Sequence, residues 1–172
     1  MHALDLPPDL SGRLLDYFDV PDERMAFLLA GPRKDDGGWT AVSELYLKDG
    51  LDYTYQGILG MQLADHVRPQ VLQWAAETGA ALVEVHSHGR SLTPTSFSPT
   101  DIDGLRDIVP QLLWRLGGQP YAAIVLGADD LDAVAWSGRG AQARTLAHVS
   151  LGGRTVAPTG AAEAVLNSKE AP

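Results

Sequence analysis

The sequence predicts an α/β domain in which a mixed, mostly antiparallel sheet is flanked by helices. The chain has 172 residues, which suits one domain, and its 45% hydrophobic and 20% charged residues are typical of a globular protein with a core. Segments with a helical period alternate with short apolar runs bounded by turn residues. We therefore expect one domain over residues 1–158 with about six to eight strands. A flexible tail should follow over residues 159–172, where Ala, Gly, Glu and Ser dominate.

Three segments have the apolar spacing or the capping residues of a helix. Residues 8–18 carry leucines and a phenylalanine three and four positions apart behind a Pro-Pro pair. Residues 67–78 repeat the helical period and end at Gly79, a residue suited to a C-terminal cap. A third helix should begin at Ser98, because a hydroxyl cap, a proline and an acidic residue follow one another there. We expect it to end at Val109, before a proline.

Short apolar runs between turn residues predict the strands. The last of them should be a hairpin that turns at Gly152-Gly153. The expected segments are residues 25–30, 39–47, 51–56, 81–88, 121–127, 131–137 and 146–156.

The composition excludes several classes of protein. Cysteine is absent, so a disulfide, a thiolate metal site and a cysteine nucleophile are ruled out. The 22 acidic and 13 basic residues give a net charge of -9, which repels nucleic acid and anionic lipid. No apolar run approaches the roughly 20 residues of a bilayer span, and the N-terminus lacks a signal-peptide pattern. We expect a cytoplasmic protein with neither nucleic acid nor membrane as its partner.

One pair of histidines has the spacing of metal ligands. His86 and His88 should project from the same face of a strand, about 7 Å apart along it. Asp101 follows in the first turn of the helix that begins at Ser98. Two imidazoles and one carboxylate form a three-ligand set for Zn²⁺ that leaves the fourth position for water. The other histidines, which we interpret as structural or solvent-facing, are His2, His66 and His148.

A family resemblance follows from these residues. His86-Ser87-His88 with Ser98-x-x-Asp101 resembles the signature of the JAMM metalloproteases, the catalytic members of the MPN-domain family, in their compact prokaryotic JAB-domain form. The alignable region runs from Leu10 to about Val156 and implies the cytidine deaminase-like architecture of that family. The family also has a glutamate at the start of an early strand, and Glu23 fits that register.

The chain departs from the family pattern in one loop. The residue after the second histidine is usually proline and is Gly89 here. The loop over residues 89–97 is also about two residues longer than is usual, a small change in closure entropy. These departures concern the shape of the loop and the choice of substrate more than the ligands. Leu92 and Phe97 are expected to line a substrate groove.

The resemblance implies a zinc-dependent peptidase or isopeptidase with one zinc per chain, held by His86, His88 and Asp101. It would hydrolyse an amide bond at the C-terminal end of a ubiquitin-like protein, a sulfur carrier or a peptide. Glu23 would be the general base for the zinc-bound water, and the Ser98 hydroxyl would hydrogen-bond the oxyanion.

Other acidic residues compete with Glu23 for the role of base. Glu84 shares the face of the predicted strand that carries His86 and is the nearest acid to the histidines in sequence. Glu44 is a weaker candidate, better interpreted as a solvated charge on the outer face of a hairpin. Asp103 should point to another side of its helix than Asp101.

Two alternative functions remain open from the sequence. One is a catalytically silent MPN-type scaffold that binds a partner protein. The other is a different metal hydrolase, because His-x-His also occurs in amidohydrolases, metallo-β-lactamases and cupins. Chain length and the residues downstream of His88 count against those three classes. A small-amide hydrolase with the JAMM fold is harder to dismiss.

Overall fold

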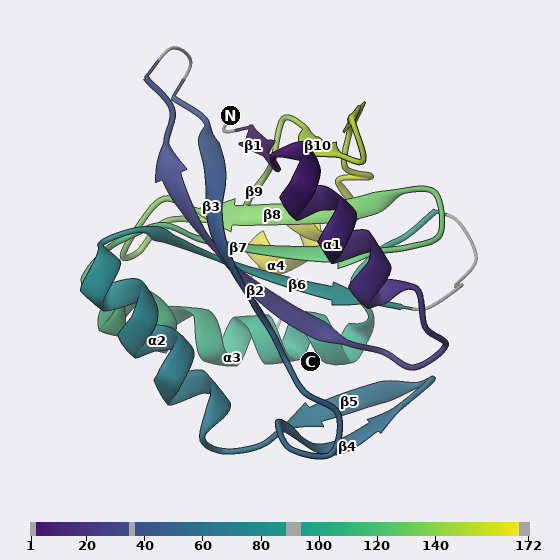
Figure 1. Cartoon of the computed structure of the whole chain (residues 1–172). Helices are drawn as coiled ribbons and strands as arrows, with labels where there is room; N and C mark the ends of the chain where they lie inside the picture. The colour runs from purple at the N-terminus through teal and green to yellow at the C-terminus, as the bar shows by residue number, and fades with distance from the viewer. Residues whose placement is uncertain (1–2, 35–36, 89–93, 169–172) are drawn as a thin grey trace.

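The computed structural model of the chain describes residues 3–34, 37–88 and 94–168. In those residues a nine-stranded mixed sheet, in the order β11-β10-β1-β3-β2-β6-β7-β8-β9, is accompanied by a separate two-stranded sheet, β4-β5 (Figure 1). The helices are α1 (Pro8–Phe18), α2 (Val67–Thr78), α3 (Pro99–Arg115) and α4 (Ala161–Asn167). The strands are β1 (Leu4–Asp5), β2 (Met25–Pro32), β3 (Trp39–Tyr46), β4 (Tyr53–Gly57), β5 (Gly60–Leu63), β6 (Ala81–Ser87), β7 (Tyr121–Leu126), β8 (Leu131–Trp136), β9 (Arg144–Thr145), β10 (Val149–Leu151) and β11 (Arg154–Val156).

The expected fold class is confirmed. Five of the eight strand pairs in the large sheet are antiparallel, and the parallel ones are β1-β10, β1-β3 and β6-β7. The sheet exceeds the expected six to eight strands because two-residue strands at β1 and β9 extend it. Such short strands carry no alternation that a sequence pattern can register.

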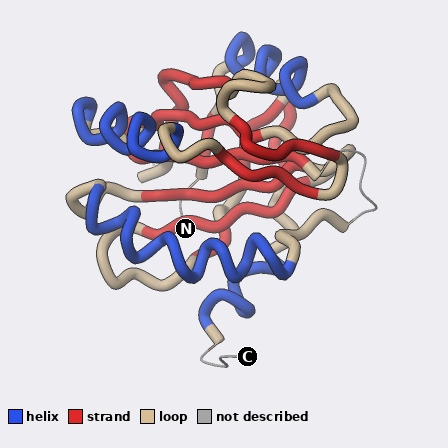
Figure 2. The backbone as a smooth tube through the Cα atoms, turned by 90° about the horizontal axis from the view of Figure 1, so that it is seen from below, coloured by secondary structure: helices blue, strands red, loops and turns tan. Residues whose placement is uncertain are grey.

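The large sheet is covered by helices on both faces, with one apolar cluster on each. The central strand β2 supplies both, since Met25, Phe27 and Leu29 belong to one cluster and the residues between them to the other. The first cluster includes buried residues of α2, α3 and α4, and the second includes those of α1. Figure 2 shows the strands as a layer between helices. Burial on both faces explains why β2 and β7 are almost entirely apolar and why β8 has a single polar residue, Asp132. In β6 the polar residues are Glu84, His86 and Ser87.

The third helix continues past the expected end at Val109. α3 runs to Arg115 with Pro110 inside it, although a proline within a helix removes one backbone hydrogen bond. Pro110 lies on the exposed side, while Leu112 and Leu113 of the final turns are buried in the core. Burial of those leucines stabilises the extension more than the missing hydrogen bond destabilises it.

We expected a flexible tail from residue 159. The first half of that segment instead forms α4. The Asp132 carboxylate, fully buried, accepts hydrogen bonds from the backbone N–H groups of Gly160 and Ala162 at 3.0 and 3.1 Å. Ala162 is 3% exposed and lies in the core cluster with α3. A buried acid far away in sequence therefore anchors this segment, which the local composition does not reveal. Residues 169–172 lie outside the described residues.

The described helices include none with both the length and the apolar character that a bilayer crossing requires.

Candidate metal centre

Strand β6 positions the two histidines. β6 lies between β2 and β7, with His86 opposite Met25 on one side and Val125 on the other. Beyond the end of β6, the backbone N–H of His88 donates to the Leu126 carbonyl at 3.1 Å, which keeps the chain extended. Alternation along that extended backbone brings the two Nε2 atoms to 3.2 Å of each other. The expected common face of His86 and His88 is therefore observed.

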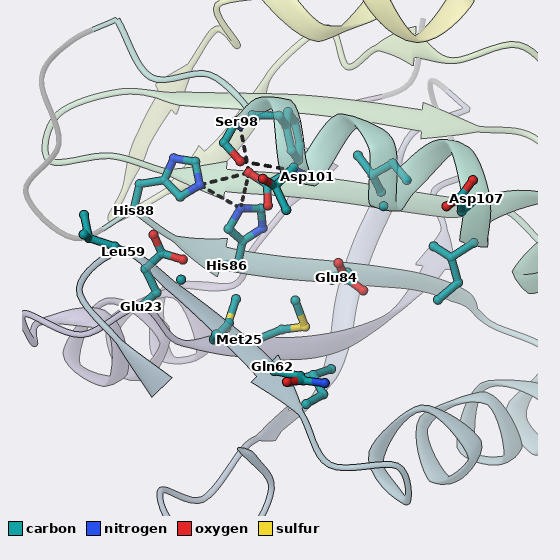
Figure 3. Close-up of a pocket in the computed structure, with 18 of the residues that line it drawn as sticks. Glu23, Met25, Leu59, Gln62, Glu84, His86, His88, Ser98, Asp101 and Asp107 are labelled. Carbon is teal, nitrogen blue, oxygen red and sulfur yellow. Dashed lines mark hydrogen bonds and ion pairs between the residues drawn. The ribbon is translucent and has the colours of Figure 1, made fainter. Parts of the chain in front are cut away.

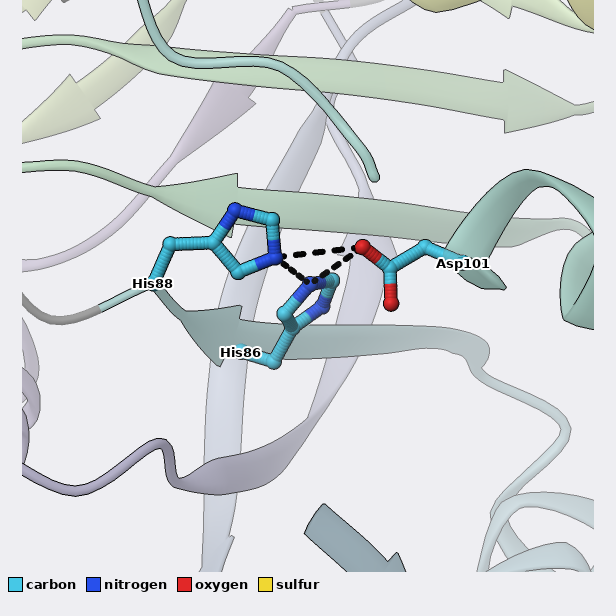
Figure 4. Close-up of side chains that lie close together, drawn as sticks. All are labelled: His86, His88 and Asp101. Carbon is cyan, nitrogen blue, oxygen red and sulfur yellow. Dashed lines mark hydrogen bonds and ion pairs between the residues drawn. The ribbon is translucent and has the colours of Figure 1, made fainter. Parts of the chain in front are cut away.

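The N-terminus of α3 brings a carboxylate to the same point. Asp101 Oδ2 lies 3.1 Å from His88 Nε2 and 3.5 Å from His86 Nε2 (Figure 4). The same oxygen accepts a hydrogen bond from the Ser98 backbone at 2.8 Å, and Ser98 Oγ accepts one from the Asp101 backbone at 3.2 Å. This reciprocal capping box fixes the side chain of Asp101 relative to β6.

The three side chains could hold a metal ion. One ligand atom each from His86, His88 and Asp101 lies within 4.8 Å of the others. His86 is buried, while His88 and Asp101 are partly exposed toward a cleft. Burial alone would raise the pKa of Asp101, but hydrogen bonds from His86 and His88 outweigh burial and lower it. The hydrogen bond to Asp101 in turn raises the pKa of His88.

Glu23 lies beside this group. Its backbone N–H donates to the Gly57 carbonyl at 3.0 Å, and its carbonyl accepts from Gln56 Nε2 at 3.2 Å, so β4 holds the segment that precedes β2. The carboxylate lines the same cleft and points toward His86 and His88 (Figure 3). Burial raises the pKa of Glu23, and the two imidazoles act in the opposite direction.

Ser98 also lines the cleft, next to Asp101. Its Oγ is used as an acceptor by the Asp101 N–H, which leaves the hydroxyl hydrogen available, since a serine offers one donor and two acceptor sites. The residue is thus both the cap of α3 and a potential hydrogen-bond donor to a ligand.

The competing acids lie elsewhere. Glu84 lines the cleft further back along β6, where its Oε2 accepts a hydrogen bond from Arg68 at 3.2 Å (Figure 3). Glu44 pairs with Arg13 at 2.6 Å, outside the cleft, and its half-buried side chain is less exposed than expected. Asp103 is exposed and lies outside the residues that line the cleft, whereas Asp101 lines it.

Of the three remaining histidines, His66 pairs with Asp52 at 2.9 Å on the surface, in keeping with a structural role. His148 is half-buried and lies outside the residues that line the cleft. His2 lies outside the described residues.

The cleft has a volume of about 850 Å³ and two walls. One is the face of α3 from Thr100 to Gln111, and the other is the β4-β5 hairpin over residues 58–63. Phe97 lines the cleft as expected, with its ring edge-on to His86 at a centroid distance of 5.7 Å. The expected contributions of Gly89 and Leu92 lie outside the described residues.

The hairpin wall and Arg68 were not predicted from the sequence as parts of the site. Gly57 and Gly60 flank Ile58 and Leu59, and this pair of glycines is the signal that marks the turn. Ile58 and Leu59 are 63% and 88% exposed, so an apolar surface faces the opening of the cleft.

Comparisons with known proteins leave the family open. No protein-family model matches the chain, and no curated protein matches it. A solved structure that is similar is the solution structure of a structural-genomics target from Desulfitobacterium hafniense, with 16% sequence identity and a TM-score of 0.43. The similarity covers 83% of this chain and 88% of that one.

Proposed function

We propose that this chain is a zinc-dependent peptidase or isopeptidase of the JAMM kind, with one zinc per chain. The observation that carries the proposal is the convergence of His86, His88 and Asp101 in an open cleft with Glu23 beside them. Zinc at about 2.0–2.1 Å from tetrahedral ligands separates those ligands by about 3.3 Å. The distances of 3.1, 3.2 and 3.5 Å between the three ligand atoms fit that geometry.

The residues present suit amide hydrolysis. A bound zinc would lower the pKa of a coordinated water to about 7 and polarise the amide carbonyl. Glu23 accepts the proton that the water loses as its oxygen adds to the carbonyl carbon. Ser98 donates its free hydroxyl hydrogen to the carbonyl oxygen as negative charge develops there. When the C–N bond breaks, Glu23 returns the proton to the departing amine.

Glu23 is favoured over Glu84 as the base. The Glu23 carboxylate points toward both imidazoles, whereas Glu84 is paired with Arg68 at the back of the cleft. A base must reach the proton that it abstracts, directly or through one water. Proximity to the ligands therefore decides between the two acids.

The cleft suits an extended peptide rather than a compact small molecule. It is open, it follows α3, and the exposed side chains of Ile58 and Leu59 stand at its mouth. The C-terminal tail of a ubiquitin-like protein or a sulfur carrier has this shape, as does a free peptide. We propose such a tail as the acyl part of the substrate.

Elemental analysis and one isosteric substitution test the proposal. The purified protein should carry about one zinc per chain and should cleave fusions of candidate carrier proteins, detected by mass spectrometry. Glu23→Gln should retain zinc and lose at least about a hundredfold in rate, while Glu77→Gln, on the exposed surface of α2, should change neither. A protein that takes up no zinc even on refolding with it refutes the metal site. Unchanged biological activity of Glu23→Gln would favour a binding scaffold instead.

A further inference from the structure

The far end of the cleft contains a buried carboxylate, paired with a partly exposed arginine, that the proposed chemistry does not use. Glu84 is 7% exposed and lines the cleft, and Arg68, at the start of α2, donates to its Oε2 at 3.2 Å. Within the described part of the chain, Arg68 is the one charged group that donates to this carboxylate. A carboxylate has about four acceptor positions, so part of its capacity is unused.

A second buried polar group adjoins this pair. The Tyr121 side chain is fully buried and adjoins the Glu84 carboxylate. Burial raises the pKa of Tyr121, and the negative charge of Glu84 and a hydrogen bond with it act in the same direction. Even with Arg68 and Tyr121 beside it, the carboxylate keeps acceptor positions that a donor entering the cleft can use.

The charges at this end of the cleft favour a cation. Glu84 and Asp107 are acidic and Arg68 is the single base among the described lining residues of this half. Arg68 already pairs with Glu84, so no other basic residue of this half is left to pair with the remaining carboxylate oxygens. The cleft is also lined by apolar side chains, among them Met61, Leu63, Leu105 and Ile108. An arginine or lysine side chain matches both features, because its aliphatic stem packs on apolar walls while its head pairs with a carboxylate.

The distance between Glu84 and the proposed metal ligands indicates how far this end lies from the bond that would be cleaved. Glu84 precedes His86 by two residues on β6, a distance of about 7 Å along the strand. The lining face of α3 extends from Asp101 to Gln111, about 15 Å at 1.5 Å per residue. An extended peptide advances about 3.3 Å per residue, so these distances correspond to about two to four residues.

We infer that Glu84, oriented by Arg68, is a specificity subsite that selects an arginine or lysine side chain about two to four residues from the cleaved bond. This inference rests on the peptidase function proposed above. It assigns Glu84 a role in substrate selection rather than in proton transfer, and it narrows the substrate class to chains with a basic residue close to the cleaved bond.

Cleavage of a synthetic random-sequence peptide library by the zinc-loaded protein tests the subsite. Mass spectrometry of the products gives the frequency of each residue around the cut. The wild-type protein should enrich arginine and lysine at one of those positions by at least about tenfold, the ratio expected for a desolvated charge pair. Glu84→Gln should abolish the enrichment, Arg68→Gln should retain it, and Glu77→Gln, an exposed acid on α2 outside the cleft, should leave it unchanged.

Zinc content and thermal unfolding of each variant show whether it is folded and loaded. Cleavage without basic enrichment, or enrichment that survives in folded Glu84→Gln, overturns the subsite while leaving the peptidase proposal intact. An acidic preference that disappears in Arg68→Gln also overturns it, since Arg68 would then be the selecting group. Failure of the zinc-loaded wild type to cut any peptide overturns the peptidase proposal, and the subsite with it.

Discussion

Asp101 caps α3 and is a proposed metal ligand, and two substitutions should separate these roles. Its Oδ2 accepts a hydrogen bond from the Ser98 backbone, which caps α3, and it lies within 3.5 Å of both imidazole nitrogens. Asp101→Asn keeps an oxygen that can cap the helix but removes the negative charge of the ligand. Ser98→Ala removes the other half of the capping box and leaves the ligand set intact. We therefore expect Ser98→Ala to lower the Tm both with and without zinc. Asp101→Asn should lower it mainly in the presence of zinc.

The expected magnitudes follow from these contacts. Loss of a serine N-cap costs about 1 kcal/mol, which lowers Tm by about 2–4 °C in a chain of this size. Zinc at a thousandfold excess over its Kd adds about 4 kcal/mol, or about 8–16 °C. If loss of the charged ligand weakens zinc binding about a hundredfold, about 2.7 kcal/mol of that gain disappears. Ser98→Ala should thus start lower and keep the full zinc-dependent rise, and Asp101→Asn should lose most of it.

Differential scanning calorimetry in chelator and at a fixed free zinc concentration measures both effects. His66→Ala is the matched control, because His66 is an exposed histidine that pairs with Asp52 outside the cleft. It should leave the zinc-dependent rise unchanged. A rise in Asp101→Asn equal to that of the wild type would refute Asp101 as a ligand. A rise abolished in Ser98→Ala would show that the capping geometry, and not the donor set, controls metal binding.

Further predictions concern the fold around the site. In the metal-free protein, the lowered pKa of Asp101 stabilises the folded state above its ordinary value of 3.8, and this contribution should fade as the pH falls through the lowered pKa. Urea unfolding at a series of pH values should show a shallower acid loss in Asp101→Asn. The raised pKa of His88 has the opposite sign, so its contribution is complete below 6.5 and should fade as the pH rises through the raised pKa; His88→Ala should remove this alkaline loss. Pro110→Ala should raise the free energy of unfolding by about 2 kcal/mol, because it restores a helix donor at an exposed position; an unchanged value in urea would contradict this. Asp132→Ala leaves three backbone amides without their acceptor and should cost about 3 kcal/mol, with faster amide hydrogen exchange in α4. Tyr17→Phe removes hydrogen bonds to the Met25 and Leu47 carbonyls and should cost about 1–3 kcal/mol by the same assay.

Elements with local signals were predictable from the sequence. The bounds of α1 agree because an amphipathic period and an N-terminal proline mark it. The start of α3 agrees because the Ser98 cap is a property of four consecutive residues. Gly79 adopts the left-handed conformation, with φ of 64°, that a C-terminal cap requires.

Elements that depend on distant burial were not predictable. α3 passes Pro110 because Leu112 and Leu113 pack into a core assembled from other segments, and α4 forms because Asp132 of β8 accepts its N-terminal amides. Neither partner is visible in a local window. In the same way, strand alternation predicts that His86 and His88 share a face, but the approach of Asp101 requires the fold. The family resemblance supplied that expectation.

The two interpretations of Ser-Pro-x-Asp, as a helix cap and as a metal-ligand motif, are compatible because they use the same atom. Asp101 Oδ2 accepts the Ser98 N–H and faces both imidazoles, so the helix cap aims the oxygen that a metal would bind. A side chain held by its own backbone loses little rotamer entropy when it binds a ligand. Metal affinity in this arrangement therefore depends on how firmly the first turn of α3 is formed. This is why the cap and the ligand must be perturbed separately before a loss of zinc is attributed to either.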